Sequence, residues 1–297
     1  MTTPATKPKH AGEAMATDGQ SELAPSLVPN AIVQTAIGMT LIASIYSSWI
    51  SGQLPDFAAW SSTLSLVIAL CSALFVSPRV FRVGYLISLL FFVIAWRVAA
   101  MNSVTLMEWV AGIAFLPFLA QFAEVIGRAW QRARLSGHVS ATVLSWQMTT
   151  IRMVFGLNEL GHATEKIFAG EASFHTLVKG FQGFGLGHAA ALFVIVGGLT
   201  EFASAVSVGL GFFARLGALM SVVYFLVATV GFGHEWTRGY EWSTNGGGGW
   251  EYVMLILVVF SAVLLGGAGK FSIDSWLLQR GLIPKKLTWV SVPRGLR

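Results

Sequence analysis

Four side chains that could do chemistry lie along one apolar stretch of the sequence, residues 142–168. They are Arg152, Glu159, His162 and Lys166. Their spacings of seven, three and four positions would place all of them on one face of a helix. A charge inside a lipid bilayer costs on the order of several kcal/mol, so this stripe must face protein or a water-filled cavity. The groups could bind an anion, exchange protons or hydrogen-bond the headgroup of a quinone.

The depth of each group in its helix predicts its partners. At about 1.5 Å per residue, Arg152 lies about 15 Å from the start of its helix, and Glu201 lies about 12 Å from the same end of an antiparallel helix over 185–208. We therefore predict a buried ion pair between Arg152 and Glu201. Near the outer membrane surface we expect a ligand pocket from groups on several helices, namely His162, Lys166, Glu251, His188 and His234.

Other interpretations of the same groups must be weighed. Polar contacts between helices often only fix how the helices pack, so the stripe could serve structure alone. Metal binding is not expected at His162 and His188, because no cysteine accompanies them and a set of ligands from separate helices cannot be inferred from spacing. The residues alone do not decide whether the protein is an enzyme.

The composition indicates that lipid surrounds the helices that must position these groups. Hydrophobic residues make up 55% of the 297 residues and charged residues only 11%, against about 25% in soluble domains. Eight apolar stretches are long enough to be spanning helices, which need about 20 residues. They cover residues 31–52, 59–77, 82–101, 108–128, 142–168, 185–208, 212–233 and 250–268. The sequence predicts an all-α polytopic protein of a bacterial plasma (inner) membrane.

A basic segment at 129–141 divides the helices into two sets of four. We expect four regions: a disordered tail over 1–29, a four-helix membrane region over 30–135, a second four-helix membrane domain over 140–280, and a basic cytoplasmic tail over 281–297. The halves share two short matches, one of which pairs Arg82-Val83-Gly84 with Arg215-Leu216-Gly217. Matches this short do not establish a repeat.

Several functions are disfavoured by the composition. A single cysteine, Cys71, cannot form an intramolecular disulfide or a redox pair, and we expect it to be a small buried hydrophobe. The sequence has no haem, flavin or iron–sulfur motif, so a redox role needs another cofactor or another subunit. The net charge of +5 fits the basic loops of a membrane protein, and nucleic-acid binding is not expected.

A series of motifs runs along the second half of the sequence. They are Arg152, Gly156, Gly161-His162 and Lys166, then Glu201, Gly211 to Arg215, His234, Gly248 to Tyr252, and Gly267 to Asp274. With these motifs the second half resembles the DoxX family of four-helix membrane proteins. The similarity covers about 142–276 and does not include 1–141, and Ala163 stands where the family usually has a second glycine.

The resemblance implies a function only in outline. Related DoxD proteins are subunits of a thiosulfate:quinone oxidoreductase, and many family members have no assigned activity. It implies a membrane subunit of a redox complex, with quinone as a candidate ligand and a periplasmic or membrane redox subunit as a candidate partner. In that interpretation His162 and Lys166 hold the headgroup, and Arg152 with Glu201 stabilises the pocket. The alternative is a non-catalytic membrane scaffold or a transporter-like carrier.

The basic loops predict the orientation of the protein in the membrane. Alternate loops carry most of the arginine and lysine residues, which places both chain termini in the cytoplasm. A reporter fused after Gly137 should therefore be active in the cytoplasm, and one fused after Trp242 should be active outside it. Both reporters on the same side of the membrane would contradict this topology.

Overall fold

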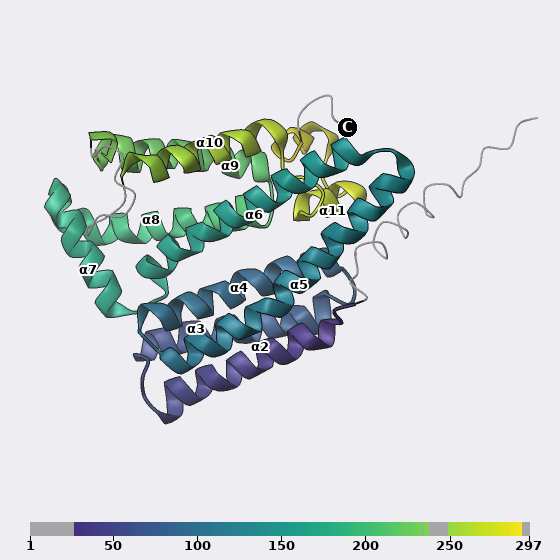
Figure 1. Ribbon diagram of the computed structural model, residues 1–297. Helices are drawn as coiled ribbons and strands as arrows, with labels where there is room; N and C mark the ends of the chain where they lie inside the picture. Colours follow the sequence, from purple (N-terminus) through teal and green to yellow (C-terminus); the bar gives the residue numbers. More distant parts are fainter. Residues whose placement is uncertain (1–26, 234, 238–248, 293–297) are drawn as a thin grey trace, which may run out of the picture.

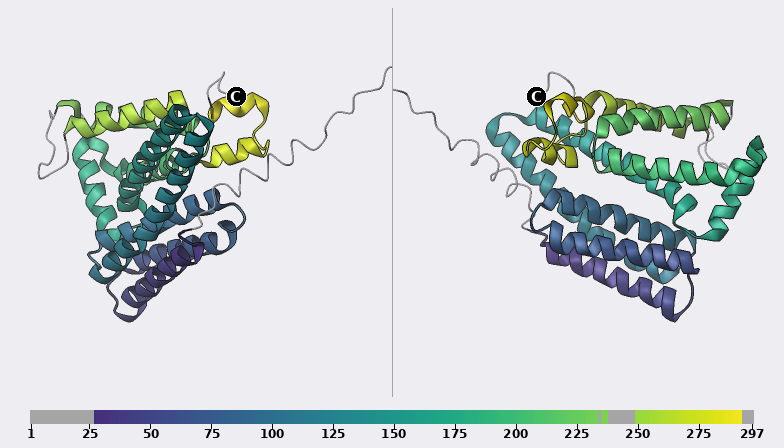
Figure 2. Two further views of the ribbon diagram at one scale, coloured as in Figure 1. Left: turned by 45° about the vertical axis from the view of Figure 1, so that its right-hand side comes forward. Right: turned by 180° about the vertical axis from the view of Figure 1, so that it is seen from behind.

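The computed structural model describes residues 27–233, 235–237 and 249–292. Most of the predicted tail over 1–29 lies outside the described residues, as do His234 and most of the loop that follows it. All regular secondary structure in the described ranges is helical. The helices lie in two groups, and the segment 139–167 runs between them (Figures 1 and 2).

The first group packs around one central helix. Its helices are α2 (Asn30–Ile45), α3 (Asp56–Cys71), α4 (Phe81–Met101) and α5 (Thr105–Ser136), and π-helical segments over Tyr46–Ile50 and Ser72–Val76 continue α2 and α3. In the apolar 18-residue stretch of α4, 61% is buried inside the protein, against 28–39% of the corresponding stretches of the other three helices. The helix α4 is therefore the core of this group, and its side chains meet α3, α5 and the second group.

The second group has an apolar core between α9 and α10 and several buried charged side chains beside it. Its helices are α6 (Val139–Ile167), α7 (Glu171–Phe181), α8 (Ala190–Ser204), α9 (Ala214–Phe225) and α10 (Trp250–Gly266). Between α7 and α8 lie Gln182–Leu186 and Gly187–Ala189, and π-helical segments over Ala205–Gly209 and Leu226–Phe232 continue α8 and α9. The helix α7 occupies a segment expected to be a loop, and it lies at an angle across one end of the group (Figure 1).

Six helical segments are long and apolar enough to cross a membrane. They are Asn30–Ile50, Asp56–Val76, Phe81–Met101, Thr105–Ser136, Glu171–Gly209 and Ala214–Phe232. The helix α10 has 17 residues and is shorter than these, and α6 is not among them because of its charged stripe. The outward faces carry large apolar side chains such as Trp60, Ile113 and Leu199. The chain is therefore a polytopic membrane protein in contact with the lipid bilayer.

One sequence expectation about a surface residue is wrong. Cys71, expected to be buried, is exposed at the end of α3. In the segment predicted to be a basic tail, a short 3₁₀ helix over Lys285–Val290 lies against the start of α9. There the Nη1 atom of Arg215 donates to the carbonyl oxygen of Trp289 at 2.6 Å.

One arrangement recurs at the helix junctions of both groups. The helices α3 and α8 each end in a five-residue π-helical segment, and the helix that follows each of them, α4 or α9, has arginine second and glycine fourth. A Cβ atom on Gly84 would lie 2.2 Å from the backbone nitrogen of Ser77, and one on Gly217 would lie 2.0 Å from the hydroxyl oxygen of Ser207. The similarity between the halves thus extends from residue types to packing at these junctions.

A close contact between two backbones in the second group predicts a stability effect. A Cβ atom on Gly156 of α6 would lie 2.2 Å from the backbone nitrogen of Gly209. Gly156→Ala should therefore destabilise the protein by about 1–3 kcal/mol, the usual cost of overpacking. Gly127→Ala in α5 is the matched control, because nothing lies within 4 Å of its added atom. Equal thermal unfolding temperatures for the two purified variants would contradict the contact.

Candidate functional site

The predicted ion pair between Arg152 and Glu201 is wrong, because each has another partner. Arg152 is fully buried, and its guanidinium donates to the carbonyl oxygens of Val208 at 2.7 Å, Gly209 at 2.6 Å and Phe271 at 2.7 Å. Helix depth placed Arg152 and Glu201 at similar levels but could not show that a π-helical turn would offer carbonyl groups to the arginine. Arg152 therefore ties α6 to the end of α8 and to the segment after α10.

The Gly267 to Asp274 motif completes this junction. Asp274 is 1% exposed, and its two carboxylate oxygens accept from the backbone N–H groups of Phe213 at 2.7 Å and Ala214 at 2.9 Å, where α9 begins. A carboxylate is favoured at a helix N-terminus. The hydroxyl of Ser272 caps the short helix α11 (Ile273–Gln279) in the same way. The motif thus has a structural role, because its buried carboxylate holds the start of α9 and is not free to bind a ligand.

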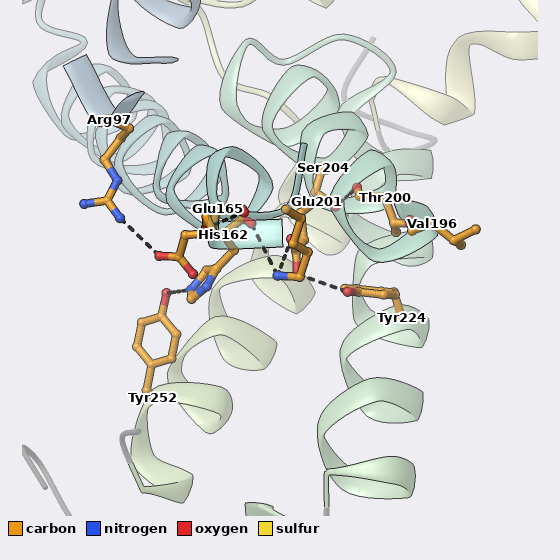
Figure 3. Close-up of polar contacts among 11 residues, drawn as sticks. Arg97, His162, Glu165, Val196, Thr200, Glu201, Ser204, Tyr224 and Tyr252 are labelled. Atoms are coloured by element: carbon orange, nitrogen blue, oxygen red, sulfur yellow. Dashed lines mark hydrogen bonds and ion pairs between the residues drawn. The ribbon is translucent and has the colours of Figure 1, made fainter. Parts of the chain in front are cut away.

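The buried ion pair of the second group joins Lys166 of α6 to Glu201 of α8. The Nζ atom of Lys166 lies 2.9 Å from both carboxylate oxygens; it hydrogen-bonds Oε1, and the contact with Oε2 is an ion pair only. The two side chains are 10% and 7% exposed. The hydroxyl of Tyr224 in α9 donates to Oε1 of Glu201 at 3.0 Å, as Figure 3 shows. Three helices therefore meet at one carboxylate.

Two glycines of α8 make room for this contact. A Cβ atom on Gly198 would lie 2.8 Å from Cβ of Lys166, and one on Gly197 would lie 3.1 Å from the hydroxyl oxygen of Tyr224. Larger residues at these positions would push α6 and α9 away from α8. The pair Gly197-Gly198, one turn before Glu201, therefore positions the lysine and the tyrosine on the carboxylate.

A second polar contact joins α6 to α10. The side-chain amide of Asn158 donates to the hydroxyl oxygen of Tyr252, and the Nε2 atom of His162 lies 3.4 Å from that oxygen. Figure 3 shows Tyr252 reaching from α10 toward His162. Glu251, the predicted pocket residue, is half-buried in the first turn of α10. Its neighbour Tyr252 is the α10 side chain that meets His162.

Glu159 lies inside the same bundle without a hydrogen-bond partner among the described residues. It is fully buried, and neither carboxylate oxygen has a donor. Its electrostatic neighbours are Glu201 and Lys166, and it in turn acts on Tyr224 and Tyr252. Buried polar groups in proteins are almost always hydrogen-bonded, so each exception needs an explanation. We call Glu159, His162, Lys166, Glu201, Tyr224 and Tyr252 the polar centre.

Two predicted pocket histidines do not join the polar centre as described. His188 is exposed in the turn before α8, and thirteen residues of helical chain, about 20 Å, separate it from Glu201. His234 lies outside the described residues. Within the described ranges, no three His, Cys, Asp or Glu side chains are grouped to hold a metal ion.

The polar centre continues toward the first group of helices. Arg97 of α4 forms an ion pair with Glu165 of α6, with Nη2 and Oε1 3.2 Å apart. The hydroxyl of Ser61 and the amide of Asn102 donate to the carbonyl oxygens of Phe168 and Ala169 just after α6, at 2.7 and 3.1 Å. The C-terminal end of α6 is thus held by α3 and α4.

Sequence reasoning found the stripe on α6 but missed its tyrosine partners. Tyr252 stands in the predicted motif from Gly248 to Tyr252, but the predicted pocket includes its neighbour Glu251 instead. Neighbouring helical residues differ by about 100° in direction, so only one of the two can face the bundle axis. Tyr224 occupies an apolar helix and has no signal in the sequence beyond its hydroxyl group.

The Lys166–Glu201 pair can be tested by a double-mutant cycle. Lys166→Met should destabilise the protein by about 3 kcal/mol or more, because it leaves the carboxylate of Glu201 buried without its cation. Adding Glu201→Gln to Lys166→Met should recover most of this loss, since the unpaired charge is then gone. Thermal unfolding of the purified single and double variants in detergent measures both steps. A double variant as unstable as the single one would contradict the pairing.

The comparisons with known proteins agree with these motifs. The DoxX family model matches residues 147–234, which run from α6 through α9. The predicted resemblance is therefore confirmed over this range, while its extension to 276 lies beyond the match. No curated protein and no solved structure gave a significant match. Residues 147–234, which hold most of the polar centre, are a DoxX family domain in the C-terminal portion of this membrane protein.

Proposed function

We propose that this protein is a membrane subunit of a redox complex that exchanges protons with a quinone at the polar centre. In this proposal α6 and α10 also cross the membrane, giving eight spans in two four-helix bundles with both termini in the cytoplasm. His162 and Lys166 face the headgroup, with Glu251 at the outer end of the site. A periplasmic or membrane subunit that carries a redox cofactor is the partner.

The observation that carries the proposal is the buried carboxyl group of Glu159. A carboxyl group with no hydrogen-bond donor inside a membrane helix bundle costs stability, and ionisable groups at such depth commonly mark substrate or proton pathways. Arg152 and Asp274 are also buried, but their partners account for them. Glu159 has no such structural account among the described residues.

The chemistry of a quinone matches the groups around Glu159. A quinone that receives two electrons also binds two protons and becomes a quinol. The electrons would come from the redox cofactor of the partner subunit, and carboxyl and imidazole side chains can pass the protons. Glu159 and His162 lie one turn apart on α6, and the tyrosine hydroxyls of α9 and α10 are hydrogen-bonded beside them.

A structural role is the second candidate, and specific contacts favour it. Lys166, Glu201 and Tyr224 are already paired with one another, as in a latch that holds three helices together. A scaffold or a transporter-like carrier could need such a latch without any bound quinone. Glu159 separates the two candidates, because a latch does not need a carboxyl group that has no donor.

Replacing the carboxyl group of Glu159 by an amide gives opposite results in the two cases. Glu159→Gln should keep or raise the thermal unfolding temperature, because it removes an unpartnered buried carboxylate. It should also lower the quinone that copurifies in its reduced quinol form in mild detergent by about tenfold, because a charge-assisted hydrogen bond from a quinol hydroxyl to the carboxylate becomes a neutral one to the amide oxygen. Mass spectrometry of the purified protein measures the bound quinone and any copurifying subunit.

The matched control is Glu171→Gln, which changes an exposed carboxylate at the start of α7. It should leave both the quinone content and the unfolding temperature unchanged. If Glu159→Gln lowers the unfolding temperature while the quinone content per folded molecule stays constant, Glu159 is structural and the redox proposal is wrong. Wild-type protein that copurifies without quinone would contradict it directly.

A further inference from the structure

A long cleft lies between the two groups of helices, outside the polar centre. Its volume is about 580 Å³, within the usual range for small-molecule sites, and its walls come from α4, α5 and α6. From Tyr85 to Ala100 the lining follows α4 for about 22 Å at 1.5 Å per residue. Leu119 of α5 and Val154 of α6 line it and are 48% and 59% exposed. The cleft therefore opens sideways to the lipid.

Four aromatic rings line the wall on the side of the first group. The rings of Trp96 and Phe115 lie 5.4 Å apart, and those of Tyr85 and Phe122 are stacked at 6.4 Å. Such rings favour a flat or unsaturated apolar guest, because they offer polarisable faces and edges. The length of the slot suits an extended chain better than a compact molecule.

One end of the cleft is polar. Arg97 and Asn158 line it there, and the side chain of Arg97 is 39% exposed beside its ion pair with Glu165. Asn158 donates to the hydroxyl of Tyr252, which lies 3.4 Å from His162. A guest with a carbonyl or hydroxyl oxygen at this end would meet the exposed part of the Arg97 guanidinium, one short hydrogen-bonded chain away from the polar centre.

A second groove of similar size provides a comparison within the same protein. It has a volume of about 550 Å³ between α2 and α5, and apart from the hydroxyl of Thr35 its lining is apolar, with Met39, Ile113 and Pro117 among the residues. A lipid chain without a specific headgroup would fit either groove. Only the cleft of α4, α5 and α6 combines an aromatic slot with charged and amide groups at one end.

We propose that this cleft is the entry and binding site for a quinone with an isoprenoid chain, taken directly from the bilayer. The chain would lie along α4, and a carbonyl oxygen of the ring would accept a hydrogen bond from the exposed part of the Arg97 guanidinium. This inference rests on the proposed function, and it adds that the first group of helices, outside the DoxX domain, supplies half of the site. Arg97 is a binding residue here, and Asn158 and Tyr252 link the ring to His162.

Binding of decylubiquinone to purified protein in phosphatidylcholine nanodiscs tests the site. Val93→Trp fills the cleft midway and should raise the Kd by about tenfold or more, since a blocked slot loses the contacts of the chain. Arg97→Lys keeps the positive charge beside Glu165 but removes the planar guanidinium and its fixed N–H donors, and it should raise the Kd by about tenfold. Ile113→Trp fills the comparison groove and should leave the Kd unchanged. Unfolding temperatures identify any variant that has lost its fold, and Arg97→Lys then carries the test.

The outcomes separate this inference from the proposed function. If Val93→Trp and Arg97→Lys are folded and bind decylubiquinone like the wild type, the cleft is the wrong site while a quinone at the polar centre still stands. If Val93→Trp and Ile113→Trp weaken binding equally, binding is not specific to the cleft. If Val93→Trp displaces only phospholipid, the occupant is an acyl chain. Absence of binding to the wild type overturns both proposals.

Discussion

The constraint on which this structure depends is the enclosure of the charged stripe of α6. Arg152 and Glu159 have no exposed surface, and Lys166 is nearly buried. Lipid cannot solvate such groups, so protein must surround α6 on every charged side. The helices α8, α9 and α10 enclose one side, and α4 encloses the other. The order of packing in the second group follows from this requirement.

The two ends of α6 meet the requirement in different ways. Around Arg152, backbone groups satisfy the buried charges. Arg152 donates to three carbonyl oxygens, and Asp274 accepts from the first N–H groups of α9. Gly156 permits the close approach that this needs. Toward the C-terminal end of α6, Lys166 and Glu201 neutralise each other. Glu159 has these two charged groups as electrostatic neighbours but no hydrogen-bond donor among the described residues. Side chains paired with side chains can change protonation and partner, whereas a guanidinium on carbonyl oxygens cannot.

This difference explains which features could be predicted from the sequence. Apolar runs predict the helices because length and hydropathy are local properties, and the spacing of Arg152 to Lys166 predicts one polar face. The partner of Arg152 depends on a π-helical turn at Ala205–Gly209, which no spacing rule reveals. The amphipathic helix α7 was taken for a loop, since it is too short to be recognised as a spanning helix. The cleft depends on how two groups of helices pack, so no local pattern contains it.

The position of α6 between the groups also bears on the role of the first half. A four-helix domain alone would leave the α4-facing side of α6, with Asn158 and Glu165, against lipid. The ion pair from Arg97 and the hydrogen bonds from Ser61 and Asn102 cover this side at the C-terminal end of α6. They do not fill it completely, and the cleft remains where the two groups diverge. The first half thus both shields α6 and leaves a lipid-facing opening beside Asn158, whose amide is hydrogen-bonded to Tyr252 next to His162. Shielding and access are consequences of the same packing, because a first half that fitted α6 perfectly would seal the polar centre from the membrane.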